Sequence, residues 1–390
     1  MLNLREAVAR VMPEAIEMRR FLHSHPELSG QELQTRSYIC RKLEQWGIPY
    51  RCCTGNLGVI ADVGKGEPCI AIRADMDVLT VQEQTGLPYA SQSLGIMHAC
   101  GHDVHTAVLL ALGRLLKEGT LSFPGTVRLL FQPGEETTGG AADMIREGCM
   151  EEPKVSAVLG FHVDPSLPVG TAAFCPGTMN AAATDFTLTV RGKGCHGAHP
   201  DEGVDAIVVS AQIVTALQSA VSRSIAPTDC GVVTVGTIRG GTKENIIADS
   251  VTMTGTVRAL RPEVQERLKA AVRSIAEHTA EGFGACAKLE MDDLCPVQSN
   301  DDVLTRKMIS VARELFGQNQ TVVMEHPSLG SDDFAFFSDR VPGCYFNVGA
   351  HTEGIPGQSL HSPTFVPHED SMETALLILT GFLLSSGASF

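Results

Sequence analysis

Two short apolar runs, "CIAIRAD" (69–75) and "TVRLLFQP" (126–133), lie on either side of the stretch "DVHTAVLLALGRLLKEG" (103–119). In that stretch apolar residues recur at intervals of three and four, which is typical of a helix, and Gly119 is a suitable helix end. A strand, a helix and a second strand in this order are typical of a parallel sheet covered by helices. We therefore expect an α/β fold built around this unit.

The alternation of strands and helices continues on both sides of this unit. It predicts a mixed, mostly parallel sheet with helices on both faces, and in such sheets ligands collect at the carboxyl ends of the strands. The further predicted strands are 58–64, 157–163, 321–325 and 344–350, and the further predicted helices are 4–23, 31–46, 139–148, 302–316 and a terminal helix.

The middle of the chain, 179–295, has a different rhythm, with strands that alternate apolar and polar residues. The predicted order is β-α-β-β-α-β, which is a known two-layer unit. We expect an inserted α+β domain here, with helices on one face of its sheet and an open opposite face. This domain would interrupt a catalytic domain made of 1–178 and 296–390.

Composition limits the possible functions. The chain has 390 residues, 43% of them hydrophobic and 19% charged, which is enough for two domains with sizeable cores. The formal net charge of −15 argues against nucleic acid and anionic membranes as partners.

The start of the chain and its cysteines bear on the compartment. The first twenty residues carry charges throughout, unlike a signal peptide, and we find no run approaching the ~20 apolar residues that span a bilayer. The twelve cysteines are scattered without a regular framework, so we expect reduced thiols and a cytoplasmic protein. Cys100 is the exception, because of its neighbours.

The stretch "MHACGHDVHT" (97–106) places Cys100 and His102 two residues apart, beside the start of a predicted helix. Thiolate and imidazole both suit zinc or a late transition metal. Taken alone, the stretch fits a metal site no better than a polar loop in which Asp103 caps the helix.

Three more loops carry ligand-type residues after predicted strands. Glu135 and Glu136 are adjacent in "QPGEETTGG" (132–140), and His162 and His361 lie in "GFHVDP" (160–165) and "GQSLHSPTF" (357–365). Taken alone, the two glutamates are more typical of a solvated acidic turn and His162 of an edge histidine, and His361 also fits an ordinary surface loop. Their joint occurrence at the ends of core strands favours a metal site.

Together the four loops offer more ligands than the four of a closed tetrahedral zinc site. Such a set fits two metal ions that share a water molecule. Glu135 is then left over as the general base. The predicted ligands are Cys100, His102, Glu136, His162 and His361.

At this point the order and spacing of the motifs resemble one metallo-amidohydrolase family over essentially the whole chain. That family includes bacterial N-acyl-L-amino acid amidohydrolases (aminoacylases), hippurate hydrolases and plant auxin-conjugate hydrolases. The motifs that carry the resemblance are "RADMDVL" (73–79), "MHACGHDVHT", "QPGEE", "GFHVDP", "GKGCHGAHP" (192–200), "NIIAD" (245–249), "GTVRAL" (255–260) and "LHSPTF" (360–365).

The resemblance implies two divalent metal ions, held by the same five ligands, with Glu135 as the catalytic carboxylate. It also implies that the inserted domain is a lid that forms a homodimer. In such a dimer His196 would reach the partner subunit's site and help to hold the oxyanion. Asn245 and Arg258 resemble residues that grip the carboxylate of the substrate.

Two aspartates in "RADMDVL", Asp75 and Asp77, resemble carboxylates that support metal-bound imidazoles from behind. The chain departs from the family pattern at two positions. Cys195 stands where relatives commonly have glycine, and Ala248 stands where proline is usual. These departures bear on the turn that holds His196 and on the placement of Asn245.

The expected activity is metal-dependent hydrolysis of N-acyl-L-amino acids, which releases a carboxylic acid and a free amino acid. Zinc, manganese, cobalt and nickel remain open as the metal. A dipeptidase or carboxypeptidase with the same metal site is an alternative. A non-catalytic metal-binding protein is another, although such a protein would have no use for Glu135.

Overall fold

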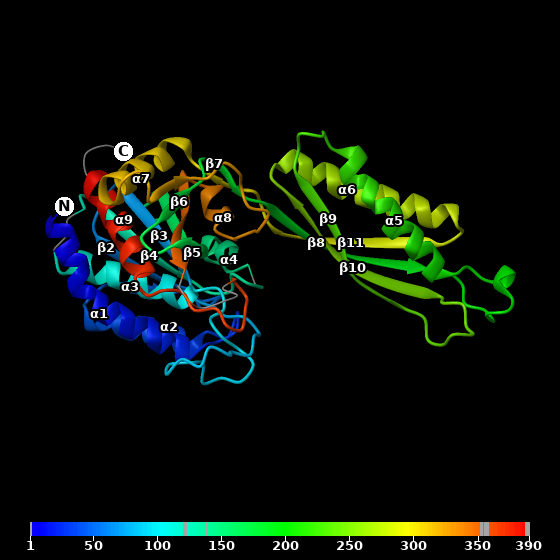
Figure 1. Ribbon diagram of the computed structural model, residues 1–390, viewed down its shortest axis with the longest axis horizontal. Coiled ribbons are helices and arrows are strands. Elements are labelled where there is room, and N and C mark those ends of the chain that lie inside the picture. The colour runs from blue at the N-terminus through cyan, green and yellow to red at the C-terminus, as the bar shows by residue number, and fades with distance from the viewer. Residues whose placement is uncertain (1, 120–122, 138, 352–353, 355–358, 387–390) are drawn as a thin grey trace. The chain divides into compact units, whose positions relative to one another are not determined.

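The computed structural model describes residues 2–119, 123–137, 139–351, 354 and 359–386 (Figure 1). The chain divides into two compact units. The first unit contains Met1–Met179, Ser299–His326 and Asp333–Phe390, and the second contains Asn180–Gln298 and Pro327–Asp332. The short segment at 327–332 is therefore grouped with the second unit, although it is distant from the rest of that unit in the sequence.

An eight-stranded sheet forms the centre of the first unit. Its central strands β4, β3, β5 and β14 run parallel, whereas β1, β2 and β6 pair in antiparallel fashion. The prediction of a mixed, mostly parallel α/β sheet is confirmed. In spatial order the strands are β1 (Tyr50–Cys52), β2 (Val59–Gly64), β4 (Thr126–Gln132), β3 (Cys69–Asp75), β5 (Val155–Pro168), β14 (Gly343–His351), β6 (Ala172–Phe174) and β13 (Thr321–Val323).

Helices cover both faces of this sheet, and the strands are apolar for that reason. In β3 every residue is buried: Ile70 and Ile72 join the larger core, and Ala71 joins the core on the opposite face. The helices of the larger core are α1 (Leu2–Ser24), α2 (Leu33–Gln45), α3 (His102–Lys117), α7 (Asp302–Phe316) and α9 (Ser371–Ser386), and those of the other face are α4 (Gly140–Arg146) and α8 (Ala335–Ser338) (Figure 1).

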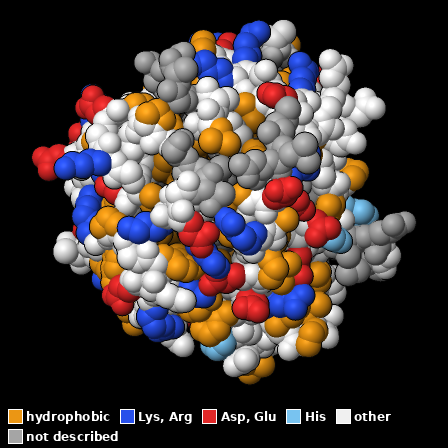
Figure 2. Space-filling model, turned by 90° about the vertical axis from the view of Figure 1, so that its left-hand side faces the viewer, with side chains coloured by type: hydrophobic (Ala, Val, Ile, Leu, Met, Phe, Trp, Pro, Cys, Tyr) orange, Lys and Arg blue, Asp and Glu red, His pale blue; other side chains and the backbone are white. Residues whose placement is uncertain are grey.

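The surface of the first unit is mixed in character. Figure 2 shows acidic, basic and apolar side chains interspersed over the face that it presents. The formal net charge of −15 is therefore not expressed as a continuous acidic field on this face.

The second unit is a four-stranded antiparallel sheet with both of its long helices on one face (Figure 1). Its elements are β8 (Ala182–Arg191), the 3-10 helix Pro200–Glu202, α5 (Ala206–Ser224), β9 (Gly231–Gly240), β10 (Ser250–Ala259), α6 (Pro262–Gly282) and β11 (Cys286–Cys295), and the strand order is β11-β8-β10-β9. The strands β7 (Gly177–Asn180) and β12 (Gln298–Asn300) form a separate two-stranded sheet.

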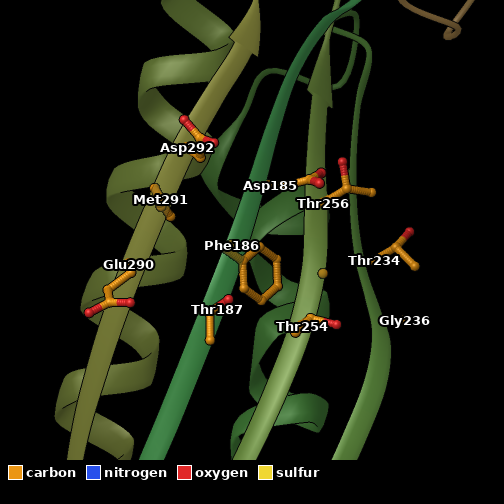
Figure 3. A pocket seen from close by; sticks show the side chains of 11 residues that line it. Asp185, Phe186, Thr187, Thr234, Gly236, Thr254, Thr256, Glu290, Met291 and Asp292 are labelled. Carbon is orange, nitrogen blue, oxygen red and sulfur yellow. The ribbon is translucent and has the colours of Figure 1, made fainter. Parts of the chain in front are cut away.

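The two faces of this second sheet differ in how far their side chains are buried. Leu188 and Val190 are buried under the helices. The opposite face holds a hollow of about 580 Å³, shown in Figure 3, where Asp185 of β8 pairs in register with Asp292 of β11 and where threonine side chains, Phe186 and Met291 complete the lining. Such a face can remain in water because most of the side chains that line it are polar.

One helix in the described part of the chain, α5, is long and apolar enough to cross a membrane by length and composition alone. The expectation that no apolar run approaches the length of a membrane span overlooks this helix. Val209, Ile213 and Leu217 of α5 are buried in the core of the second unit. Packing in a domain core therefore accounts for part of its apolar content, since 33% of the apolar window of the helix is buried.

A buried ion pair anchors α1 to α3. Nε of Arg19 donates to Asp103 at 2.8 Å, His23 lies 2.9 Å from the same oxygen, and both members of the Arg19–Asp103 pair have fully buried side chains. Burial alone would raise the pKa of Asp103, but the nearby Arg19 and His23 outweigh it and hold this pKa well below its usual range.

Replacing Arg19 by methionine should therefore leave the Asp103 carboxylate buried without its main counter-charge. We expect Arg19→Met to lower the free energy of unfolding by about 3–5 kcal/mol in urea denaturation. Arg20→Met is the matched control. Like Arg19, Arg20 pairs with Glu369, but the side chain of Arg20 is 48% exposed, so this substitution should lower the free energy of unfolding by at most about 1 kcal/mol. Equal losses for the two variants would contradict this account.

Candidate metal centre

The five predicted ligand residues all lie in the first unit, on four different segments. Cys100 and His102 lie at the start of α3, and His162 lies in β5. Glu136 is in the turn after β4, and His361 is in the segment before α9. The structure brings all five together.

The distances define two overlapping groups of ligand atoms. Sγ of Cys100 lies 3.3 Å from Nε2 of His162, and Oε1 of Glu136 lies 3.6 Å from Nε2 of His361 and 4.0 Å from Nε2 of His102. Within each group the ligand atoms lie within 4.8 Å of one another. One group is Cys100, His102 and His162, and the other is Cys100, Glu136 and His361.

The environment of one carboxylate oxygen in this cluster shows whether the cluster suits a metal ion. Oε1 of Glu136 is buried and has no hydrogen-bond partner among the described residues. It nevertheless faces two imidazole nitrogens. An unpaired buried carboxylate oxygen is costly, and a cation bound between these nitrogen, sulfur and oxygen donors would remove that cost. The donor set therefore fits divalent metal ions.

Hydrogen bonds on the far side of two imidazoles turn their Nε2 atoms towards the cluster. Nδ1 of His102 lies 3.1 Å from Oδ1 of Asp77, and Nδ1 of His162 donates to the carbonyl oxygen of Val163 at 2.7 Å. Both rings then present Nε2 to a metal ion, as ligand histidines commonly do.

Burial shifts the protonation of the cluster. It lowers the pKa of His162 to about 3, so this imidazole is neutral, which is the form that binds metals. Burial also raises the pKa values of the Cys100 thiol and the Glu136 carboxyl. For His102 burial acts to lower the pKa, but Asp75 and Cys100 outweigh it and raise the pKa. Metal ions would displace these protons.

The two aspartates expected behind the imidazoles are placed differently. Asp77 does lie behind His102, and its Oδ2 accepts hydrogen bonds from the backbone N–H of Glu136 at 2.9 Å and from Oγ of Ser29 at 2.6 Å. Oδ2 of Asp75 instead lies 3.6 Å from Nε2 of His102, the nitrogen on the metal side. Its Oδ1 lies 2.6 Å from Nδ1 of His105.

A buried network around Asp75 was not predicted from the sequence. Arg73 donates to Asp75 at 2.7 Å and to Asp333 at 2.8 Å, and its side chain is buried. Nε2 of His105 accepts the backbone N–H of Val163, so both ring nitrogens of His105 are already engaged. The available signal was a charged residue, Arg73, inside an otherwise apolar strand.

Glu135 is half-buried beside the cluster, in the turn that also carries Glu136. One of its carboxylate oxygens lies within 4.8 Å of the ligand atoms of His102 and Glu136. This carboxylate can therefore exchange a proton with a water molecule bound at the cluster.

His196 and Asn245 lie side by side in the second unit. His196 forms a bridge with Ile246, and the N–H of Gly197 donates to the carbonyl oxygen of Asn245 at 2.8 Å. His196 is exposed, and its Nδ1 accepts the N–H of Ala198 at 3.1 Å. A neutral His196 ring therefore carries its proton on Nε2.

Arg258 is not with them. Asn245 shortly precedes the first residue of β10, whereas Arg258 lies next to the last residue of that strand. The guanidinium of Arg258 donates to Thr256 at 3.2 Å and to Ser331 at 2.5 Å. At about 3.3 Å per residue, the eight steps from Ser250 to Arg258 span about 26 Å. Within one chain the structure does not bring Arg258 together with His196 and Asn245.

The two departures from the family pattern are accommodated locally. Sγ of Cys195 donates to the carbonyl oxygen of His199 at 3.2 Å and so closes the turn around His196. Ala248 is buried, and its carbonyl oxygen accepts the N–H of Ala206 at 3.1 Å.

Gly101 separates the two ligands at the start of α3 in a conformation that suits glycine, with φ +92°. A Cβ added there would lie 2.4 Å from Cγ2 of Val163. Gly101→Ala should therefore lower the free energy of unfolding by more than the about 1–2 kcal/mol of backbone strain alone. Gly95→Ala is the control, because Gly95 has φ +79° and open space around it. Equal losses in chemical denaturation would show that the Val163 contact does not matter.

Comparisons with known proteins place this geometry in a family. Residues 71–385 match the model of peptidase family M20/M25/M40. The chain is 39% identical over 375 residues to the N-acetyl-L-cysteine deacetylase of Bacillus subtilis (strain 168), covering 96% of this chain and 87% of that protein. It is 38% identical over 359 residues to the IAA-amino acid hydrolase ILR1-like 2 of Arabidopsis thaliana, covering 91% and 81%.

Among solved structures, the chain is similar to the YxeP protein of Bacillus subtilis, described as a dinuclear metal binding peptidase from the M20 family. The TM-score is 0.84 at 34% sequence identity, and the alignment covers 98% of this chain and 100% of that one. The predicted metallo-amidohydrolase family is confirmed. The chain belongs to peptidase family M20/M25/M40 and is an amidohydrolase.

Proposed function

We propose that this protein uses two divalent metal ions to hydrolyse the amide bond of N-acyl-L-amino acids. The observation that carries the proposal is the buried, unpaired Oε1 of Glu136 among imidazole and thiol ligands, with a second carboxylate, Glu135, beside it. The names of the deacetylase and IAA-amino acid hydrolase relatives support this substrate class, and the dinuclear YxeP protein supports two ions.

Cys100, His102, Glu136, His162 and His361 would hold the ions, and the thiolate favours zinc, cobalt or nickel, with manganese also possible for the harder donors. When bound, the ions supply Lewis acidity towards the amide carbonyl and lower the pKa of water. Glu135 takes the proton of the attacking water and passes it to the leaving amine. The Nε2–H of His196 donates to the oxyanion.

Substrate binding in this proposal needs two subunits. Arg258 and the His196–Asn245 pair lie towards opposite ends of β10, whose stretch from Ser250 to Arg258 spans about 26 Å, so they act on one substrate carboxylate only if two chains supply them. A homodimer through the second unit meets this need. Strand β9 lies at the edge of its sheet, and the neighbouring helix α5 exposes Ile207 and Val208.

We place the enzyme in the cytoplasm. All twelve cysteines are free thiols, which suits a reducing compartment. Its substrate is a small molecule, and neither nucleic acid nor a membrane has a part in the proposal.

The first test is hydrolysis of N-acetyl- and N-benzoyl-amino acids, with dipeptides alongside, by metal-reconstituted protein. Glu135→Gln should keep both metal ions but lower kcat by about 10²–10⁴-fold, because the general base is gone. Metal content by mass spectrometry and amino acid release are the measurements. Near-normal activity of Glu135→Gln would refute the mechanism. Activity on dipeptides alone would show that the substrates are dipeptides and not N-acyl-amino acids.

The dimer is tested by complementation. His196→Ala and Glu135→Gln proteins should each be inactive, whereas a mixed dimer would contain one site with an intact Glu135 and the partner's intact His196. Activity should therefore return after subunit exchange, which native mass spectrometry can confirm. Confirmed exchange without activity would show that His196 acts in its own subunit or not at all.

A further inference from the structure

Glu32 is a buried carboxylate directly before α2 that its own helix does not use. Its side chain is 0% exposed, and it makes no side-chain capping bond although it occupies the N-cap position. The first amides of α2 are capped by Glu27 instead, which accepts the N–H groups of Gln34 at 3.0 Å and Thr35 at 2.8 Å. Capping therefore does not explain why Glu32 is buried.

The Glu32 side chain reaches the turn after β4. Its Oε1 accepts the backbone N–H of Gly134 at 2.9 Å. Gly134 has φ +64° and immediately precedes Glu135 and Glu136, and its carbonyl oxygen accepts the N–H of Gly140 at 3.2 Å. A glycine in this region has a wide choice of backbone conformations, so hydrogen bonds on both sides of Gly134 limit the direction in which the next residues leave.

We propose that Glu32 is a positioning residue for Glu135. By holding the amide of Gly134 from the segment before α2, it fixes the turn that presents the Glu135 carboxylate to the metal cluster. The inference rests on the proposed function in so far as Glu135 is the base. Glu32 itself touches neither substrate nor metal ligands in this account.

The environment of the Glu32 carboxyl is unfavourable, which is consistent with a functional role. Burial raises its pKa to about 7, and Asp77 acts in the same direction, whereas the backbone N–H groups of Glu32, Gly30 and Gly134 act against the shift. Its second oxygen, Oε2, is buried without a hydrogen-bond partner among the described residues. A carboxyl kept in so unfavourable a place is a candidate for function. Oε1 can accept the Gly134 amide in either protonation state.

Three variants separate positioning from stability. Glu32→Ala removes the acceptor and should lower kcat by about 10- to 100-fold with KM and metal content unchanged, because the base is misplaced but the substrate still binds. Glu32→Gln keeps an acceptor oxygen and should stay close to the wild type. Glu27→Ala, the control that removes the cap of the same helix, should lower Tm without lowering kcat.

A second measurement does not depend on the substrate. Hydrogen exchange, followed by mass spectrometry on a peptide that contains Gly134, should be faster in Glu32→Ala than in the wild type and in Glu32→Gln. If the wild type hydrolyses no N-acyl-amino acid, the proposed function fails while the exchange data still decide the role of Glu32. The inference is overturned if Glu32→Ala keeps the wild-type kcat, or if exchange at Gly134 does not change.

Discussion

The candidate metal centre depends on the buried carboxylate of Asp77, which joins ligands from two separate loops. One oxygen holds the ring of His102, and the other accepts the backbone N–H of Glu136 and the hydroxyl of Ser29. Burial alone would raise the pKa of Asp77, but these hydrogen bonds and the charge of His102 outweigh it and lower the pKa. An ionised Asp77 therefore fixes the positions of α3, the turn after β4 and the segment before α2 relative to one another.

Much of the fold could be predicted because its main elements are long and strongly patterned. The strand–helix–strand unit at 69–133 and the alternating strands of the second unit follow directly from residue periodicity. The strands β1, β6, β7 and β12 and the helix α8 escaped prediction, since elements of three or four residues are too short to show a period. Strand β5 runs on to Pro168, beyond the apolar run that predicted it.

For the site, the sequence shows which residue types follow core strands but not which residues meet. Arg73 and Asp333 are separated by 260 positions, and nothing in either local pattern points to the other. The contact of Glu32 with Gly134 is hidden in the same way. The distance between Arg258 and Asn245 becomes visible only when the length of β10 is known, because that strand sets the distance between its two ends.

The raised pKa of Glu32 has a consequence for how folding depends on acidity. In the folded protein the group keeps its proton up to about pH 7, whereas the ordinary value for an unfolded chain is 4.5. Between these values the native state binds more protons than the denatured state, so this group's contribution to stability falls as pH rises and is fully present below 4.5. The carboxyl that orders the turn after β4 thus makes a slightly alkaline solution less favourable for the native state than a mildly acidic one, in contrast to Asp77.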